Sequence, residues 1–227
     1  MARTSGPETR DKLIRAAEEL FAAQGVDGAQ LRDIVALAGQ SNPSAVQYHF
    51  GSRAGLLDAV MAGRQRRTEQ VLEPLLAEAP DEPHALLRAL IGAEASELRT
   101  ERGRRCLRIS AQLSHESGVR TRTPHPTLDG TVYWRLIERV EACLTGSTGL
   151  PGRPGLPGLP EALLLERLDL ALTVVGAAMA DRARQYLDGT VPLTDEELFL
   201  ADLVQTTTAL LQAPPPPSMP SIRKDLS

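Results

Sequence analysis

The stretch from Leu31 to Phe50, LRDIVALAGQSNPSAVQYHF, constrains the fold of this chain more than any other part of it. In its first half, apolar side chains recur three or four positions apart, which is the spacing of one buried helix face. These side chains are Leu31, Ile34, Val35 and Ala38. Gly39 follows directly and can adopt the left-handed backbone that ends a helix. The first half therefore predicts a short helix that stops at Gly39.

The second half of the stretch predicts another short helix. Asn42-Pro43 can begin it, because proline has no N–H to lose in the first turn of a helix. Val46 and Phe50 lie four positions apart and share the packing face, so polar side chains off that face point away from it. The side chains expected to point away are Ser44, Gln47 and Tyr48. Two short helices joined by a tight turn, the second with polar and aromatic tips, form a helix-turn-helix.

Three ordered segments extend this pattern on both sides, between Leu13 and Val60: LIRAAEELFAAQGVDG, LRDIVALAG and AVQYHFGSRAGLLDAV. Together they resemble the N-terminal domain of the tetracycline-repressor (TetR) family of transcriptional regulators. The resemblance implies an all-α fold, with an N-terminal three-helix helix-turn-helix domain, a larger C-terminal helical bundle domain and about nine helices in all. There are two departures from the family pattern. The turn carries an extra residue, which leaves open which of Asn42, Pro43 and Ser44 reaches a base. Ala29 replaces the usual capping Thr or Ser, so we expect Asp27 or Gly28 to cap the first helix of the motif.

The resemblance also implies which side chains contact double-stranded DNA. Base reading is expected from Ser44 and Gln47, because a glutamine amide can donate to and accept from adenine at once. Phosphate contacts are expected from side chains flanking the motif, and Arg32 is expected at either a guanine or a phosphate. The predicted DNA-binding residues are Gln30, Arg32, Pro43, Ser44, Gln47, Tyr48, His49 and Arg53. For each of them the alternative is an ordinary solvated side chain.

Charge is distributed unevenly along the chain. Its net charge is −4, which excludes a basic protein that wraps nucleic acid. Residues 1–67 nevertheless hold nine basic and seven acidic side chains, and residues 68–227 hold sixteen and twenty-two. A positive head on an acidic body fits local contact with phosphate.

Breaks in helical periodicity divide the chain into segments. Thr9 is expected to cap the first helix, which Gln24-Gly25 ends, and Ser52 is expected to cap a helix beginning at Arg53. The predicted segments are a disordered arm at 1–8, the DNA-binding domain at 9–52, an effector-binding and dimerisation domain at 53–212 with a mobile Gly/Pro loop at 146–160, and a disordered tail at 213–227. Body helices are expected at 53–78, 84–99, 103–116, 128–144, 161–187 and 194–212, the last capped by Thr194.

The helix at 161–187 is apolar nearly all round between Leu170 and Ala180, so it must be covered on both sides. The resemblance implies a homodimer in which the helices at 161–187 and 194–212 pair with their twins. It also implies a small, mainly apolar effector of unknown identity within the body. The candidate lining residues are Cys106, His115, Tyr133, Trp134 and Met179, for which ordinary core packing is the alternative.

Each of two arginine-rich stretches can be interpreted either as a binding site or as ordinary surface. Arg64, Arg66 and Arg67 form either a basic patch or, as we expect, a solvated face. The stretch from Arg99 to Arg108 could bind an anion, but pairing with nearby glutamates is the expected arrangement. The sequence shows neither a signal peptide nor an apolar run long enough to span a bilayer, which indicates a cytoplasmic protein. We therefore expect its two cysteines, Cys106 and Cys143, to be free thiols.

Catalysis has little support in the sequence. Ser114, His115 and Asp129 suggest a hydrolase only weakly, and no G-x-S-x-G, paired-histidine metal motif or glycine-rich phosphate loop is present, so we expect no enzyme, metal or cofactor. The leading hypothesis is a dimeric, ligand-responsive repressor released from an inverted-repeat operator by its effector. The alternative is a helical interaction protein that has lost DNA binding.

Overall fold

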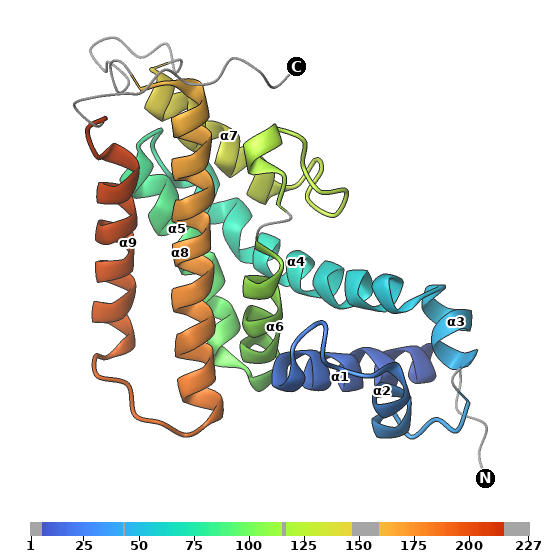
Figure 1. Cartoon of the computed structure of the whole chain (residues 1–227). Helices are drawn as coiled ribbons and strands as arrows, with labels where there is room; N and C mark the ends of the chain where they lie inside the picture. Colours follow the sequence, from blue (N-terminus) through green and yellow to red (C-terminus); the bar gives the residue numbers. More distant parts are fainter. Residues whose placement is uncertain (1–5, 43, 115–116, 147–158, 216–227) are drawn as a thin grey trace.

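A computed structural model describes residues 6–42, 44–114, 117–146 and 159–215. This part of the chain is helical throughout, with nine α-helices, two short 3-10 helices and no strand, which confirms the all-α expectation (Figure 1). The elements are α1 (Gly6–Gln24), α2 (Leu31–Leu37), α3 (Ser44–Phe50), α4 (Arg53–Glu78), α5 (Pro83–Ser96), η1 (Glu97–Arg99), α6 (Glu101–Gln112), η3 (Val119–Thr121), α7 (Val132–Thr145), α8 (Glu161–Leu187) and α9 (Glu196–Gln212).

The first three helices form a head at one end of the molecule (Figure 1). The helix-turn-helix is present as predicted, with Gly39 in the left-handed region at φ 68° between α2 and α3. The side chain of Asn42 accepts a hydrogen bond from the backbone N–H of Ser44 at 2.9 Å, so it satisfies one of the free donors in the first turn of α3.

The predicted start of α1 was wrong. The helix begins at Gly6, and Thr9, which was expected to cap it, is buried inside the helix. Residues 6–8 therefore belong to α1 and not to a disordered arm, while residues 1–5 lie outside the described part of the chain. Thr9 lies on the side of α1 that packs into the head. This packing stabilises the first turns of the helix, so α1 begins before Thr9.

The apolar core of the head does not stop at residue 52. Leu56 and Val60 from α4 and Cys106 and Ile109 from α6 are fully buried in the same cluster as Leu13, Phe21, Ile34 and Val46. Helix α6 thus closes the head core from the side of the body, although it lies about 50 residues beyond the head in the sequence.

Helix α4 leads from the head into the body, where α5, α7, α8 and α9 surround two further apolar clusters (Figure 1). Helices α8 and α9 lie side by side and antiparallel at the far edge. Predicted bounds for α4 and α8 are confirmed, and Ser52 caps α4 as expected by accepting from Gly55 N at 3.0 Å.

Several other boundaries also differ from the prediction: α5 ends at Ser96, where η1 follows, and α6 begins at Glu101. Helix α9 begins at Glu196, because Asp195 caps it by accepting from Leu198 N at 2.8 Å, while Thr194 accepts from Arg182 instead. Helix α7 begins at Val132 and not near 128, because the Thr131 hydroxyl caps it by accepting from Trp134 N at 3.1 Å. Helix α6 ends at Gln112, four residues earlier than predicted.

Most of the predicted mobile loop (147–158) and of the tail (216–227) lies outside the described residues. Among the helices that are described, none combines the length and apolar character of a membrane span.

Candidate DNA-binding surface and body cavity

Helix α3 presents one polar face to the surroundings and buries the other. Val46 is 1% exposed in the head core, whereas Ser44, Gln47 and Tyr48 are exposed, with Tyr48 at 83%. Positions i, i+3 and i+4 of a helix are neighbours, so these three side chains form one continuous face. The structure therefore brings together the predicted base-reading pair and one predicted phosphate contact. Pro43 lies outside the described residues.

Two predicted contacts lie at α2, one within the helix and one at its N-cap. Arg32 is well exposed, with 83% of its side chain accessible, and its Nε lies 3.4 Å from the Asp33 carboxylate. Such an exposed pair is weak, so the guanidinium is free to exchange partners. Gln30 is the N-cap residue of α2 without a side-chain cap bond, and its side-chain amide donates to Gly28 O at 3.3 Å. The expectation that Asp27 or Gly28 caps α2 was therefore wrong.

Arg53 has partners inside the head. Its guanidinium donates to Val26 O and, at 3.2 Å, to Ala29 O, and it lies 5.2 Å from the ring centroid of Phe21. These contacts tie the start of α4 to the α1–α2 connection and leave the side chain half-buried. The predicted phosphate contact of Arg53 is thus opposed by a structural role that sequence reasoning did not identify.

Two further side chains make aromatic contacts at α3, one of them from α1. Arg10 of α1 stacks over the ring of Phe50 with its guanidinium carbon 5.1 Å from the centroid, and His49 packs edge-on to Tyr48 at 4.9 Å between centroids. The sequence did not single out Arg10 for this role, because its partner lies 40 residues away in the chain. Because Arg10 contacts α3 from α1, it helps to fix the orientation of the exposed α3 face, whereas the His49–Tyr48 contact lies within α3.

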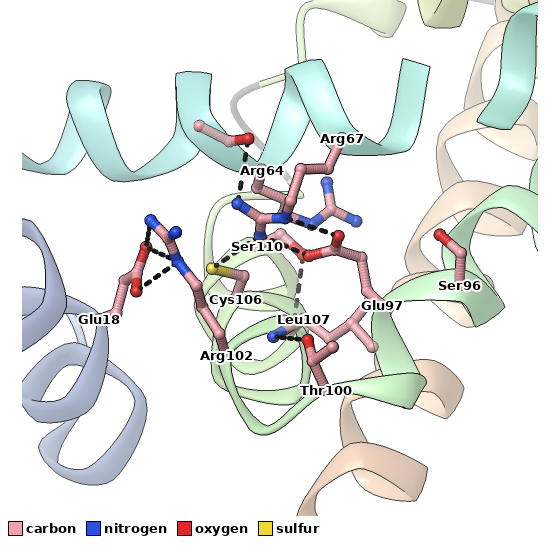
Figure 2. Close-up of polar contacts among 12 residues, drawn as sticks. Glu18, Arg64, Arg67, Ser96, Glu97, Thr100, Arg102, Cys106, Leu107 and Ser110 are labelled. Atoms are coloured by element: carbon pink, nitrogen blue, oxygen red, sulfur yellow. Dashed lines mark hydrogen bonds and ion pairs between the residues drawn. The ribbon is translucent and has the colours of Figure 1, made fainter. Parts of the chain in front are cut away.

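Polar contacts join the head to α6 at both ends of that helix. Glu18 of α1, which is 2% exposed, accepts hydrogen bonds from Arg102 at 2.7 to 2.9 Å, with both carboxylate oxygens engaged (Figure 2). At the other end, the Gln112 side chain accepts from Val26 N at 2.8 Å. These charge-assisted and backbone contacts attach α6 to the head at two points.

The predicted solvated face of α4 was wrong for two of its three arginines. Arg64 is 7% exposed and donates to the Glu94 carboxylate of α5, which is also buried. Arg67 donates to both oxygens of Glu97 at 3.0 and 2.7 Å and lies 3.6 Å from the Cys106 sulfur (Figure 2). The acidic partners stand 30 residues away, so helical periodicity alone could not reveal them.

Both pairs are charged. Burial by itself would lower the pKa of Arg64, but attraction to Glu94 and the hydrogen bond between them outweigh it and raise that pKa above its usual range. The same balance, with Glu97 as partner, raises the pKa of Arg67. Burial and the nearby Glu18 carboxylate raise the pKa of the Cys106 thiol to about 11, so it is protonated and unreactive at neutral pH.

Three arginines of the stretch from Arg99 to Arg108 are paired with carboxylates, as expected, whereas Arg104 donates to Leu98 O at 2.7 Å. Arg105 contacts Glu101 at 2.6 Å and Arg99 contacts Glu196 at 3.7 Å, in addition to the Arg102–Glu18 pair.

A cavity of about 170 Å³ lies within the body, bounded by α4, α5, α6, α7, α8 and the α6–α7 connection. Its wall includes apolar side chains from α4, α5 and α8 together with Arg64 and Glu94. Tyr133 is the one predicted lining residue found there among those the structure describes. The complete lining is Leu57, Asp58, Met61, Arg64, Gln65, Leu90, Glu94, Ser110, Leu113, Ser114, Ser117, His125, Thr127, Leu128, Tyr133, Leu172, Val175 and Gly176.

The other predicted lining residues lie elsewhere. Cys106 is buried in the head core, Met179 in the cluster that α5, α6, α8 and α9 form, and Trp134 packs on the outside of the remaining body cluster. His115 lies outside the described residues. Helical period could identify buried positions but not the cluster to which each belongs, so the expected pocket was wrong for these three. Among the described residues, no three metal-ligating side chains gather in one place.

The head is similar in sequence to a known family of proteins. The model for bacterial regulatory proteins of the tetR family matches residues 13–60. Over 67 residues the chain is 43% identical to the HTH-type transcriptional regulator SrpR of Pseudomonas putida, covering 30% of this chain and 31% of SrpR. It is also 43% identical over 67 residues to the uncharacterized HTH-type transcriptional regulator TtgW of Pseudomonas putida, covering 30% of this chain and 49% of TtgW.

The chain thus spans between about a third and a half of the length of these relatives. The structure as a whole is similar to that of a mutant of HlyIIR, at 13% identity and a TM-score of 0.52, covering 93% of this chain and 99% of the other, which shows a shared fold. The family and the relatives are transcriptional regulators and not enzymes. The helix-turn-helix head of this chain is thus similar to that of bacterial regulatory proteins of the tetR family, over residues 13–60.

Proposed function

We propose that this protein is a sequence-specific DNA-binding transcriptional regulator that acts as a repressor. The observation that carries the proposal is the exposed face of α3, formed by Ser44, Gln47 and Tyr48 within the segment that matches the family. A helix with a buried apolar face and an exposed polar face can enter the major groove and read base edges. Gln30, Arg32 and His49 flank this face and supply phosphate contacts.

A dimer follows from the outer edge of the body. Leu170 on α8 and Leu198 on α9 are 51% and 56% exposed, on helices that otherwise bury much of their apolar surface. Pairing these two helices with those of a second copy covers both leucines and gives a four-helix interface with two-fold symmetry. Two heads related by that symmetry read an inverted-repeat operator.

The cavity provides a route for release by a small effector. Helix α4 carries Leu57, Met61 and Arg64 in the cavity wall, and its first turn is tied to the head through Arg53. A molecule that binds in the cavity more tightly in one position of α4 than in another shifts the head, and so lowers affinity for the operator. The DNA-binding domain then comprises residues 9–52 together with the first turn of α1 at residues 6–8. Residues 53–212 form the domain that binds the effector and the second copy of the chain.

Selection of bound fragments from random DNA by the purified protein, at near-physiological salt, tests this function. We expect a two-fold symmetric consensus, and we expect Gln47→Ala to cost about 1–3 kcal/mol at one base position of it. Equal losses for Gln47→Ala on the consensus and on random DNA would remove the reading role of that residue.

The absence of any consensus, also after ligand is stripped by refolding, would favour the interaction-protein alternative. Light scattering in the same preparation measures the oligomeric state. We expect a dimer that Leu170→Glu separates into monomers, with Leu193→Glu, a fully exposed position outside α8 and α9, as the matched control.

A further inference from the structure

The cavity contains a buried ion pair at its wall. Arg64 from α4 and Glu94 from α5 line it, each 7% exposed, and the guanidinium donates to one carboxylate oxygen. A guanidinium has five N–H donors, and the Nε of Arg64 has no hydrogen-bond partner among the described residues. A buried donor without a partner costs free energy, so an acceptor supplied at this guanidinium is stabilising.

The pair sets the charge that a bound molecule can carry. Arg64 is the only lysine or arginine in the described lining, and Glu94 already neutralises it. An anion bound there adds an uncompensated negative charge beside Glu94 and near Asp58, which lies at the exposed rim. A cation adds an uncompensated positive charge beside Arg64. Both cases have a large desolvation cost, so the site favours an uncharged molecule.

Hydroxyl groups around the pair define the polarity further. Ser110 and Ser114 donate to backbone carbonyls of the preceding helix turn, at 3.1 Å in each case, so toward the cavity their oxygens can only accept. Burial and the Glu94 carboxylate raise the pKa of Tyr133 well above its usual range, so its hydroxyl remains a donor. The cavity lining therefore offers both hydrogen-bond donors and acceptors.

The rest of the wall and the volume define size and shape. Leucine and valine side chains from α5 and α8, among them Leu90, Leu172 and Val175, face the cavity together with Met61 of α4. Its volume of about 170 Å³ is close to that of an engineered apolar cavity of about 150 Å³ that holds benzene. One ring with a small substituent fits this space.

We propose that the cavity binds an uncharged, single-ring hydroxylated molecule of the phenol class, with its hydroxyl at the Arg64–Glu94 pair and its ring against the apolar wall. A hydroxyl suits the pair because it accepts from Arg64 and donates to Glu94 at once. The inference rests on the proposed function only in naming this molecule as the effector class.

The test is calorimetric titration of the full chain, without DNA, using phenol, toluene, benzoate and benzylamine as probes. These four share one ring and differ in the group attached to it. We expect phenol to bind at least about tenfold more tightly than each of the others, because a hydrogen bond to a charged group is worth at least that factor. Toluene is the most stringent control, because it is more apolar than phenol and would bind more tightly if only the apolar wall determined affinity. Tighter or equal binding of toluene, benzoate or benzylamine, or no binding of phenol, overturns the proposal.

Paired variants assign the preference to the ion pair. Arg64→Met with Glu94→Leu removes both charges together and leaves neither partner buried alone. We expect this double variant to bind toluene as tightly as phenol. The matched control is Arg67→Met with Glu97→Leu, which removes the neighbouring pair outside the cavity lining, and we expect it to keep the tenfold preference.

Equal loss of preference in the two double variants, or its retention in the first, contradicts the assignment. Because no DNA is present, these outcomes are independent of whether an operator is recognised.

Discussion

Replacement of Arg53 by alanine separates a structural from a DNA-contacting role for this side chain. The change removes the hydrogen bonds to Val26 O and Ala29 O and the stacking on Phe21. For a half-buried guanidinium each hydrogen bond contributes about 1 kcal/mol and the ring contact about 0.5–1 kcal/mol. The expected loss of stability is therefore about 2–3 kcal/mol, or a fall in Tm of roughly 4–12 °C for a chain of this size.

Thermal unfolding and DNA titration over a range of salt concentrations, on the same variants, measure the two roles. Arg53→Lys keeps the charge but cannot reach both carbonyls in the same geometry, so we expect it to lose most of the stability that alanine loses. Arg32→Ala is the matched control: it removes an exposed arginine of the same surface, and we expect an unchanged Tm and a salt dependence of DNA binding lowered by about one ion. An unchanged Tm for Arg53→Ala together with the lowered salt dependence would refute the structural role and restore the phosphate contact.

Three further predictions concern the buried polar groups and the shared core. Arg64→Met alone should destabilise the protein by about 3–5 kcal/mol in denaturant unfolding, because Glu94 stays buried without its partner, while the double variant with Glu94→Leu should be near neutral. A similar loss in both would contradict this. The raised pKa of Cys106 means that the folded state holds the thiol proton more tightly than the unfolded chain, so stability should fall between about pH 9 and 11, and Cys106→Ala should show a smaller fall over that window. Ile109→Ala should cost about 2–5 kcal/mol and also weaken DNA binding, since Ile109 completes the head core; unchanged unfolding of the head, followed by hydrogen exchange in α1, would contradict it.

The sequence by itself determined the features that depend on helical period and on a single left-handed glycine. The spacing of Ile34, Val35 and Val46 and the glycine at position 39 predicted the helix-turn-helix and its exposed face, because both depend on helical period and on one left-handed residue. The bounds of α4 and α8 were predicted correctly for the same reason. Where two neighbouring residues could cap a helix, as with Thr194 and Asp195, the sequence could not decide between them, since the choice depended on Arg182 in another helix.

Only the tertiary structure decided which partner each charged side chain has. From the sequence, Arg53 was predicted to contact phosphate, and Arg64 and Arg67 to lie on a solvated face. Both predictions missed the actual partners, Val26, Glu94 and Glu97, because these lie about 30 residues away in the chain. The assignment of α6 to the head core and the cavity at the same time is also invisible in its own periodicity. Helical periodicity predicts which side chains are buried. The free energy of a buried charge depends on the charged or polar group that it contacts, and that partner is fixed only when distant helices pack together.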